Sequence, residues 1–268
     1  GLGAALLSGV GSGSTDAGES GKARNAVRTY LPKIISDLEK DGSPKAREVI
    51  GTLQAARKES LKKGAKELLT NTDVDSSEWQ SRESFFTEQQ EEFEKYLTDR
   101  SDNAELNRFR NGMNESLKEG FTSMGYMNPK GWASRQGFLV AQQAKIEASG
   151  DVGRIADMRQ HVAKELPKAL VNLMGNYSST HGAQQKQFID DQQAKLRAAL
   201  TLAEREQFDN AMLKSALGVM LSPDRSFSDA GQAIGQEYIN VMNQRLAAAN
   251  DDEQLAIITA VSSEFKRV

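Results

Sequence analysis

Cysteine is absent from all 268 residues, which excludes disulfides, thiolate metal ligands and a thiol nucleophile. Histidine occurs only twice, and aromatic residues make up 6% of the chain, which fits helices with wide solvated faces. No apolar run approaches the roughly 20 residues that a membrane-spanning helix needs. The formal net charge of −3 gives the molecule as a whole no electrostatic attraction for nucleic acid.

Helical periodicity dominates what the sequence does contain. Between residues 184 and 200, apolar side chains recur at steps of three and four, which places them on one side of a helix. Thr201 and Glu204 then have the spacing of a capping box, so a second helix should begin there. This second helix, which continues to Leu221, is apolar over more than half of its circumference. It must therefore be covered by other helices from two directions.

The same signals recur in the rest of the chain. Between Leu106 and Phe121, apolar residues follow one another at steps of three and four, as on the buried seam of a helix. Pro32 and Pro167 should kink or restart the helices that contain them. No segment alternates apolar and polar residues as a strand would, and no repeat of fixed period is present. We therefore predict an all-α fold, a multi-helix bundle of about nine helices with room for two helical subdomains.

Composition divides the chain into three parts. Residues 1–21 are mainly Gly, Ser and Ala, which predicts a flexible or partner-ordered arm. A cluster of turn-forming residues at 125–131 marks the boundary between an N-terminal helical part, 22–127, and a C-terminal helical part, 128–268. Apolar side chains return at helical spacing within the arm, which suggests that residues 1–13 contact a membrane or an assembly partner. The side chains in question are Leu2, Leu6, Leu7 and Val10.

Charge is distributed unevenly in the N-terminal part. The clearest basic cluster lies at 57–66, and acidic residues far outnumber basic ones between Asp73 and Glu105. Two such segments attract each other when they pack side by side, but solvated helix faces also explain both segments. A basic cluster can in addition contact anionic lipid or nucleic acid. Pairs of glutamines along the helices, such as Gln89 with Gln90 and Gln142 with Gln143, could hydrogen-bond across helix interfaces. The cluster consists of Arg57, Lys58, Lys62, Lys63 and Lys66.

One short segment has the letters of a phosphate-binding loop. Residues 16–23 read D-A-G-E-S-G-K-A, and A-G-E-S-G-K resembles the phosphate loop of heterotrimeric G-protein α subunits. The resemblance covers six residues and implies nucleotide binding. The chain departs from the motif at Asp16, where the loop needs glycine, and at Ala23, where a magnesium-binding Ser or Thr belongs.

Two other arrangements bear on catalysis. Residues 82–86 read R-E-S-F-F, which resembles the segment around the catalytic glutamate of lytic transglycosylases; the resemblance implies that Glu83 is a general acid. The Gly-Leu-Met-Gln stretch of that family does not follow. Asp157, His161 and Glu165 fall at i, i+4 and i+8, on one face of a helix, where they could orient an imidazole or offer metal ligands. No complementary motif elsewhere completes either site.

These observations favour a protein that acts through its surfaces. We predict a non-enzymatic helical structural or interaction protein, a component or cargo of a larger assembly of the virion-internal or secreted type. We expect other protein subunits as partners, no cofactor or metal, and an N-terminal arm that docks to a membrane or an assembly. Because the chain begins with Gly1 rather than Met, we also expect that something preceded it.

Two alternatives from other classes remain open on the sequence alone. The first is an enzyme acting on glycan or another polar substrate through Glu83 or the face formed by Asp157, His161 and Glu165. The second is an adaptor for anionic lipid or nucleic acid that uses the cluster at 57–66.

Overall fold

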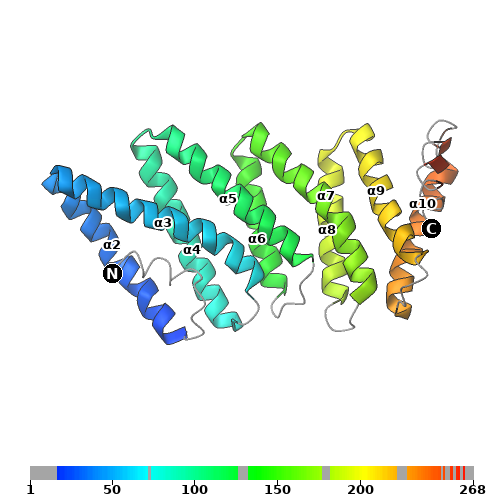
Figure 1. The fold of residues 1–268 in the computed structure, drawn as a ribbon, viewed down its shortest axis with the longest axis horizontal. Helices are drawn as coiled ribbons and strands as arrows, with labels where there is room; N and C mark the ends of the chain where they lie inside the picture. The colour runs from blue at the N-terminus through cyan, green and yellow to red at the C-terminus, as the bar shows by residue number, and fades with distance from the viewer. Residues whose placement is uncertain are drawn as a thin grey trace. The chain divides into compact units, whose positions relative to one another are not determined.

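The computed structural model describes residues 17–71, 74–125, 132–176, 182–221 and 228–248, together with residues 250, 254–255, 258–259 and 262. Over these residues the fold is all-α without any strand, as predicted (Figure 1). The nine helices of this part are α2 (Ala17–Asp41), α3 (Pro44–Thr70), α4 (Ser76–Asp99), α5 (Asn103–Met124), α6 (Trp132–Ala148), α7 (Val152–Asn176), α8 (Gly182–Ala199), α9 (Leu202–Met220) and α10 (Asp229–Ala248). No helix among the described residues is both long enough and apolar enough to cross a bilayer.

Part of the segment predicted as a flexible arm is helical. Helix α2 begins at Ala17, so the last five residues of the predicted arm, 1–21, belong to a helix. The resemblance to a phosphate loop therefore falls on helical backbone from Ala17 onward, and this backbone cannot form the turn that would wrap a phosphate. The apolar positions of the arm, Leu2, Leu6, Leu7 and Val10, lie outside the described residues.

Contacts divide the chain into two compact units. The first unit runs to Phe121 and takes in Ala133–Ser149, so it contains α2, α3, α4, most of α5, and α6. The second unit consists of Thr122–Trp132 and the chain from Gly150 onward, and contains α7 to α10. The boundary predicted between residues 127 and 128 lies outside the described residues, and α6 groups with the N-terminal helices.

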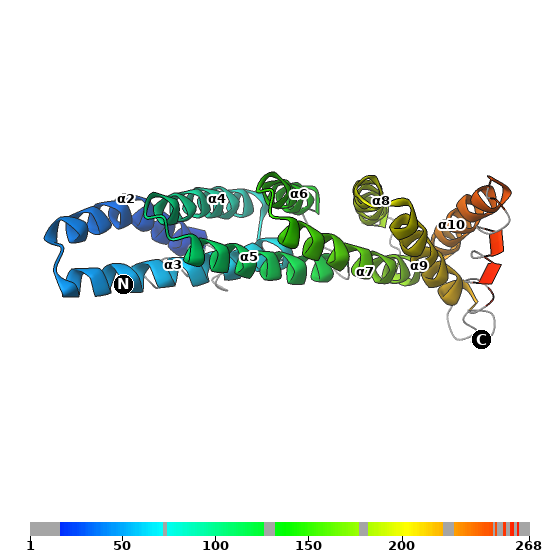
Figure 2. The same ribbon diagram turned by 90° about the horizontal axis from the view of Figure 1, so that it is seen from above.

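The first unit is built in two layers. Helices α2, α4 and α6 lie in one layer, and α3 and α5 lie in the other (Figure 2). Ser43 caps α3 by accepting a hydrogen bond from the amide of Ala46, with Pro44 at the first helical position. Aromatic side chains fill the space between the helices. The ring of Phe138 in α6 lies edge-on to that of Phe86 in α4, with 5.4 Å between the ring centroids. The rings of Phe93 in α4 and Phe109 in α5 are also edge-on, with 4.8 Å between their centroids. The unit therefore has an apolar core at its centre.

The second unit is organised around α7, which contacts α8, α9 and α10. Helix α9 is covered by both α7 and α10, as its apolar circumference requires. Gly231 lets α10 approach α7 closely, because a Cβ atom at this position would lie 2.3 Å from the carbonyl oxygen of Met174. Helix α7 continues through Pro167, and α2 continues through Pro32, so neither proline restarts its helix.

Candidate functional site

The predicted basic cluster is paired with carboxylates. Arg57 of α3 pairs with Glu92 of α4, and Lys58 pairs with Glu105 of α5 at 2.9 Å. Lys66 reaches Glu119 of α5 at 2.8 Å. The other two cations pair within α3, Lys62 with Glu59 and Lys63 with Glu67. The cluster thus joins α3 to the acidic helices beside it, and little unbalanced positive charge remains there for an anionic partner.

The acidic helix α4 receives cations from the helices around it. Arg28 of α2 donates from Nε to Glu88 at 2.6 Å, and Lys145 of α6 lies 3.5 Å from Glu91. Arg110 of α5 donates through two nitrogens to Glu94, at 2.6 and 2.9 Å. Together with Arg57 on α3, these contacts place α4 at the centre of the charge network of the first unit.

A buried group of three charges forms the core of this network. Glu78 of α4 accepts two parallel hydrogen bonds from Arg24 of α2, at 2.6 and 2.9 Å, and one from Nε of Arg82, at 2.7 Å. All three side chains are under 10% exposed. Burial by itself raises the pKa of the Glu78 carboxyl, but the hydrogen bonds and charges of the two arginines outweigh it and hold that pKa below its usual value. Glu78 therefore stays ionised.

A predicted glutamine contact is also present in this unit. The side-chain amide of Gln142 on α6 donates to the side-chain oxygen of Gln90 on α4 at 3.2 Å, and both side chains are buried. Such a contact satisfies two buried polar groups without introducing charge. Uncharged amides thus supplement the ion pairs that join the helices.

The residues predicted as catalytic candidates lie on α4 and α7. Glu83 of α4 is partly exposed and makes no hydrogen bond or ion pair with any described residue. On α7, Nε2 of His161 lies 2.9 Å from the hydroxyl of Thr122, while the buried Glu165 pairs with Lys168 at 2.7 Å. No group of three metal-ligating side chains that could hold an ion occurs in the described ranges.

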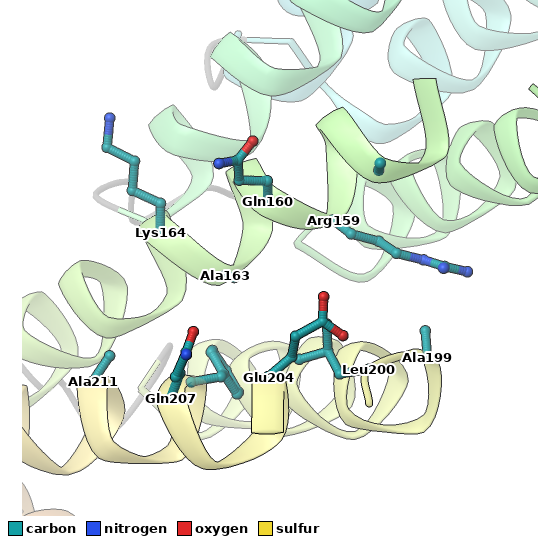
Figure 3. A pocket seen from close by; sticks show the side chains of 11 residues that line it. Arg159, Gln160, Ala163, Lys164, Ala199, Leu200, Glu204, Gln207 and Ala211 are labelled. Atoms are coloured by element: carbon teal, nitrogen blue, oxygen red, sulfur yellow. The ribbon is translucent and has the colours of Figure 1, made fainter. Parts of the chain in front are cut away.

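A pocket that the sequence did not indicate lies in the second unit. It has a volume of about 570 Å³ and is formed by the first half of α7, the end of α8 and the first half of α9 (Figure 3). Small side chains on these helices leave the space open, and the buried ring of Phe208 lines it from α9. The small residues are Ala156, Ala163, Ala199 and Ala211. This volume falls within the range of small-molecule sites in proteins.

The polar lining of this pocket includes charges of both signs. Arg159, Gln160 and Lys164 come from α7, and Glu204 and Gln207 come from α9. The side chain of Arg159 runs along the gap between the helices, whereas that of Lys164 points away from it (Figure 3). Nε of Arg159 is buried without a hydrogen-bond partner, and the side chain forms no ion pair with the described residues. Arg159 thus lines the pocket with one buried donor, Nε–H, that lacks an acceptor.

Glu204, opposite Arg159, is already used as a helix cap. Its Oε2 accepts hydrogen bonds from the hydroxyl of Thr201 at 2.7 Å and from the amide of Thr201 at 2.9 Å. These two bonds lower the pKa of the Glu204 carboxyl, so it remains negative at neutral pH. The predicted capping box is confirmed. It holds this carboxylate at the start of α9 rather than on Arg159.

No protein-family model matches the sequence, and neither a curated protein nor a solved structure resembles it closely enough to count as a match.

Proposed function

We propose that this chain is a non-catalytic helical protein that acts through its surfaces, as a component or cargo of a larger assembly. The observation that supports this most is the use of charge in the first unit. The cations at 57–66 and the acids of α4, which a binding or catalytic site could have used, join the helices to one another. Most of these pairs link different helices, as expected of a rigid scaffold.

The surface of the described residues also offers apolar contacts. Eight large apolar side chains are exposed, among them Val152 at the start of α7, which is 78% exposed, and Leu202 at the start of α9, which is 67% exposed. Exposed apolar side chains are common on proteins, but they are also the groups that a partner protein buries. We propose that other protein subunits cover part of this surface, with the arm at 1–13 as a further docking segment on a membrane or in the assembly.

Deletion of residues 1–13 tests this function. The full chain and the deleted chain are compared by sedimentation velocity over a range of concentrations, and by flotation with vesicles of neutral and of anionic lipid. The proposal predicts that the full chain self-associates or floats with vesicles, and that the deletion abolishes this behaviour. An arm that is dispensable for both association and flotation would remove the main support for a docking role.

A double replacement on the same arm separates apolar docking from a simple effect of length. Leu6→Ser with Leu7→Ser keeps every residue and removes two apolar side chains. If apolar contact drives docking, this variant should behave like the deletion, since each buried leucine contributes about 1.5–3 kcal/mol. Ser12→Ala with Ser14→Ala is the matched control and should leave both assays unchanged.

A further inference from the structure

The pocket between α7 and α9 combines an arginine that forms no ion pair with the described residues, Arg159, with an apolar wall. The Nε–H of Arg159 is buried without an acceptor, and its guanidinium forms no ion pair with a described residue. The alanines and Phe208 beside it offer apolar surface but no hydrogen-bonding groups. A ligand that suits both features carries an anionic group at one end and carbon chain at the other.

The geometry also selects the kind of anion. A guanidinium donates two parallel hydrogen bonds, and these match the two oxygens of a carboxylate. Glu204 keeps a negative charge on the facing wall, and Lys164 points out of the gap (Figure 3). A dianion would therefore be repelled by Glu204, with only the charge of Arg159 in the gap to offset the repulsion. A singly charged group is repelled less.

We propose that this pocket binds a monocarboxylate with a short apolar body, with Arg159 holding the carboxylate and the alanine wall holding the carbon chain. The inference is independent of the assembly role proposed above. The same chemistry occurs in a free alkanoate and in a glutamate side chain flanked by leucines on a partner protein, and the two sources are distinguished by the probes below.

The test is an NMR titration of the full chain labelled with ¹⁵N, observed at the side-chain Nε–Hε signal of Arg159. Sodium acetate, butanoate and hexanoate are added in turn at constant ionic strength. The proposal predicts a saturable shift, with binding that tightens by up to about fourfold for each methylene that the pocket buries. Sodium sulfate is the comparison anion and should bind more weakly than hexanoate.

Variants assign the effect to the pocket. Arg159→Gln should abolish hexanoate binding, and Ala163→Leu, which keeps the arginine and fills the cavity, should weaken it at least tenfold. Both are followed through amide signals of α7 and α9, which also show whether the unit remains folded. Arg47→Gln removes the same charge from an exposed position on α3 and serves as the matched control. It should bind hexanoate like the wild type.

A second probe identifies the source of the carboxylate. A blocked peptide Leu-Glu-Leu is compared with Leu-Gln-Leu and with hexanoate in the same titration. Tighter binding of the glutamate peptide than of hexanoate supports a carboxylate carried by a partner protein, and the reverse order supports a free acid. Absence of a saturable shift with every probe would overturn the proposal. So would binding that survives in Arg159→Gln, or sulfate binding as strong as hexanoate binding.

Discussion

Replacement of Glu78 by glutamine is the sharpest test of the buried charge network. The change keeps the size of the side chain but leaves Arg24 and Arg82 in the core without the carboxylate that accepts three of their hydrogen bonds. Removing one partner of a buried ion pair costs about 3–5 kcal/mol. The charge of the Glu67 carboxylate also acts on Arg82 and offsets part of the loss. We therefore expect the free energy of unfolding of the first unit to fall by about 3 kcal/mol.

Trp79 provides a local readout of this loss. Its indole Nε1–H donates to the carbonyl oxygen of Leu68 at 2.9 Å, and its ring is buried against Phe138 in the first unit. The chain has two tryptophans, so a Trp132→Phe background leaves Trp79 as the single fluorophore. With a urea m-value of about 2 kcal/mol/M, the predicted loss lowers the unfolding midpoint by about 1.5 M.

A control on the same helix separates burial from charge. Asp99→Asn breaks an exposed pair with Lys95 at the end of α4, and this change should alter stability by less than about 0.5 kcal/mol. If Glu78→Gln shifts the midpoint no more than Asp99→Asn does, the buried group does not hold the helices together and the reasoning fails.

The dependence on pH gives a second check on Glu78. Because the folded-state pKa of Glu78 lies below its unfolded value, its contribution to stability is complete above the unfolded pKa. That contribution is lost as the pH falls through the lowered folded pKa. The difference in stability between the wild type and Glu78→Gln should therefore shrink toward acid pH. A difference that stays constant down to pH 2 would contradict this account.

Four further predictions follow from the packing, the cap of α9 and the raised pKa of Glu67. Gly51→Ala, at an exposed site of α3 with no atom within 4 Å of the added Cβ, should stabilise the first unit by about 1 kcal/mol. Gly120→Ala, where the added Cβ would lie 2.5 Å from Cδ1 of Leu69, should destabilise the first unit by about 1–3 kcal/mol. If both alanine substitutions shift the unfolding transition of Trp79 equally, the close contact between Gly120 and Leu69 is refuted. Thr201→Ala removes the cap of α9 and should cost the second unit about 1 kcal/mol in thermal unfolding followed by circular dichroism, whereas an unchanged transition would show that the cap is dispensable. Burial raises the pKa of the Glu67 carboxyl, so Glu67→Gln should be at least as stable as the wild type at pH 7 in urea titrations. Any gain in stability should vanish as the pH falls through that raised pKa. A variant that is less stable at pH 7 and equally stable in acid would refute the raised pKa.

Local signals in the sequence predicted most of the fold. Capping pairs such as Thr201 with Glu204, and apolar steps of three and four, report short-range geometry that each helix forms largely by itself. Pairing between the basic segment at 57–66 and the acidic segment after it was one of two interpretations that composition allowed, the other being separately solvated helix faces. The partners could not be predicted individually, since they depend on which faces of α3, α4 and α5 meet.

The pocket could not be predicted because it depends on two segments far apart in the chain. Ala156 and Ala163 are ordinary helix formers in sequence, and so is Ala211; they leave a cavity only because α7 packs beside α9. The state of Arg159 had no sequence signal either, because many of the groups that surround its side chain come from helices other than its own. The capping box itself was predicted, but not that it would leave Arg159 unpaired.

We propose that this chain acts by contact with partners and not by turnover of a substrate. The most direct measurement is the release of soluble fragments from peptidoglycan and other glycan polymers by the wild type, Glu83→Gln and His161→Ala. The account predicts that all three proteins leave the polymers at the level of a blank without protein. Fragment release by the wild type that is lost in either variant would contradict it.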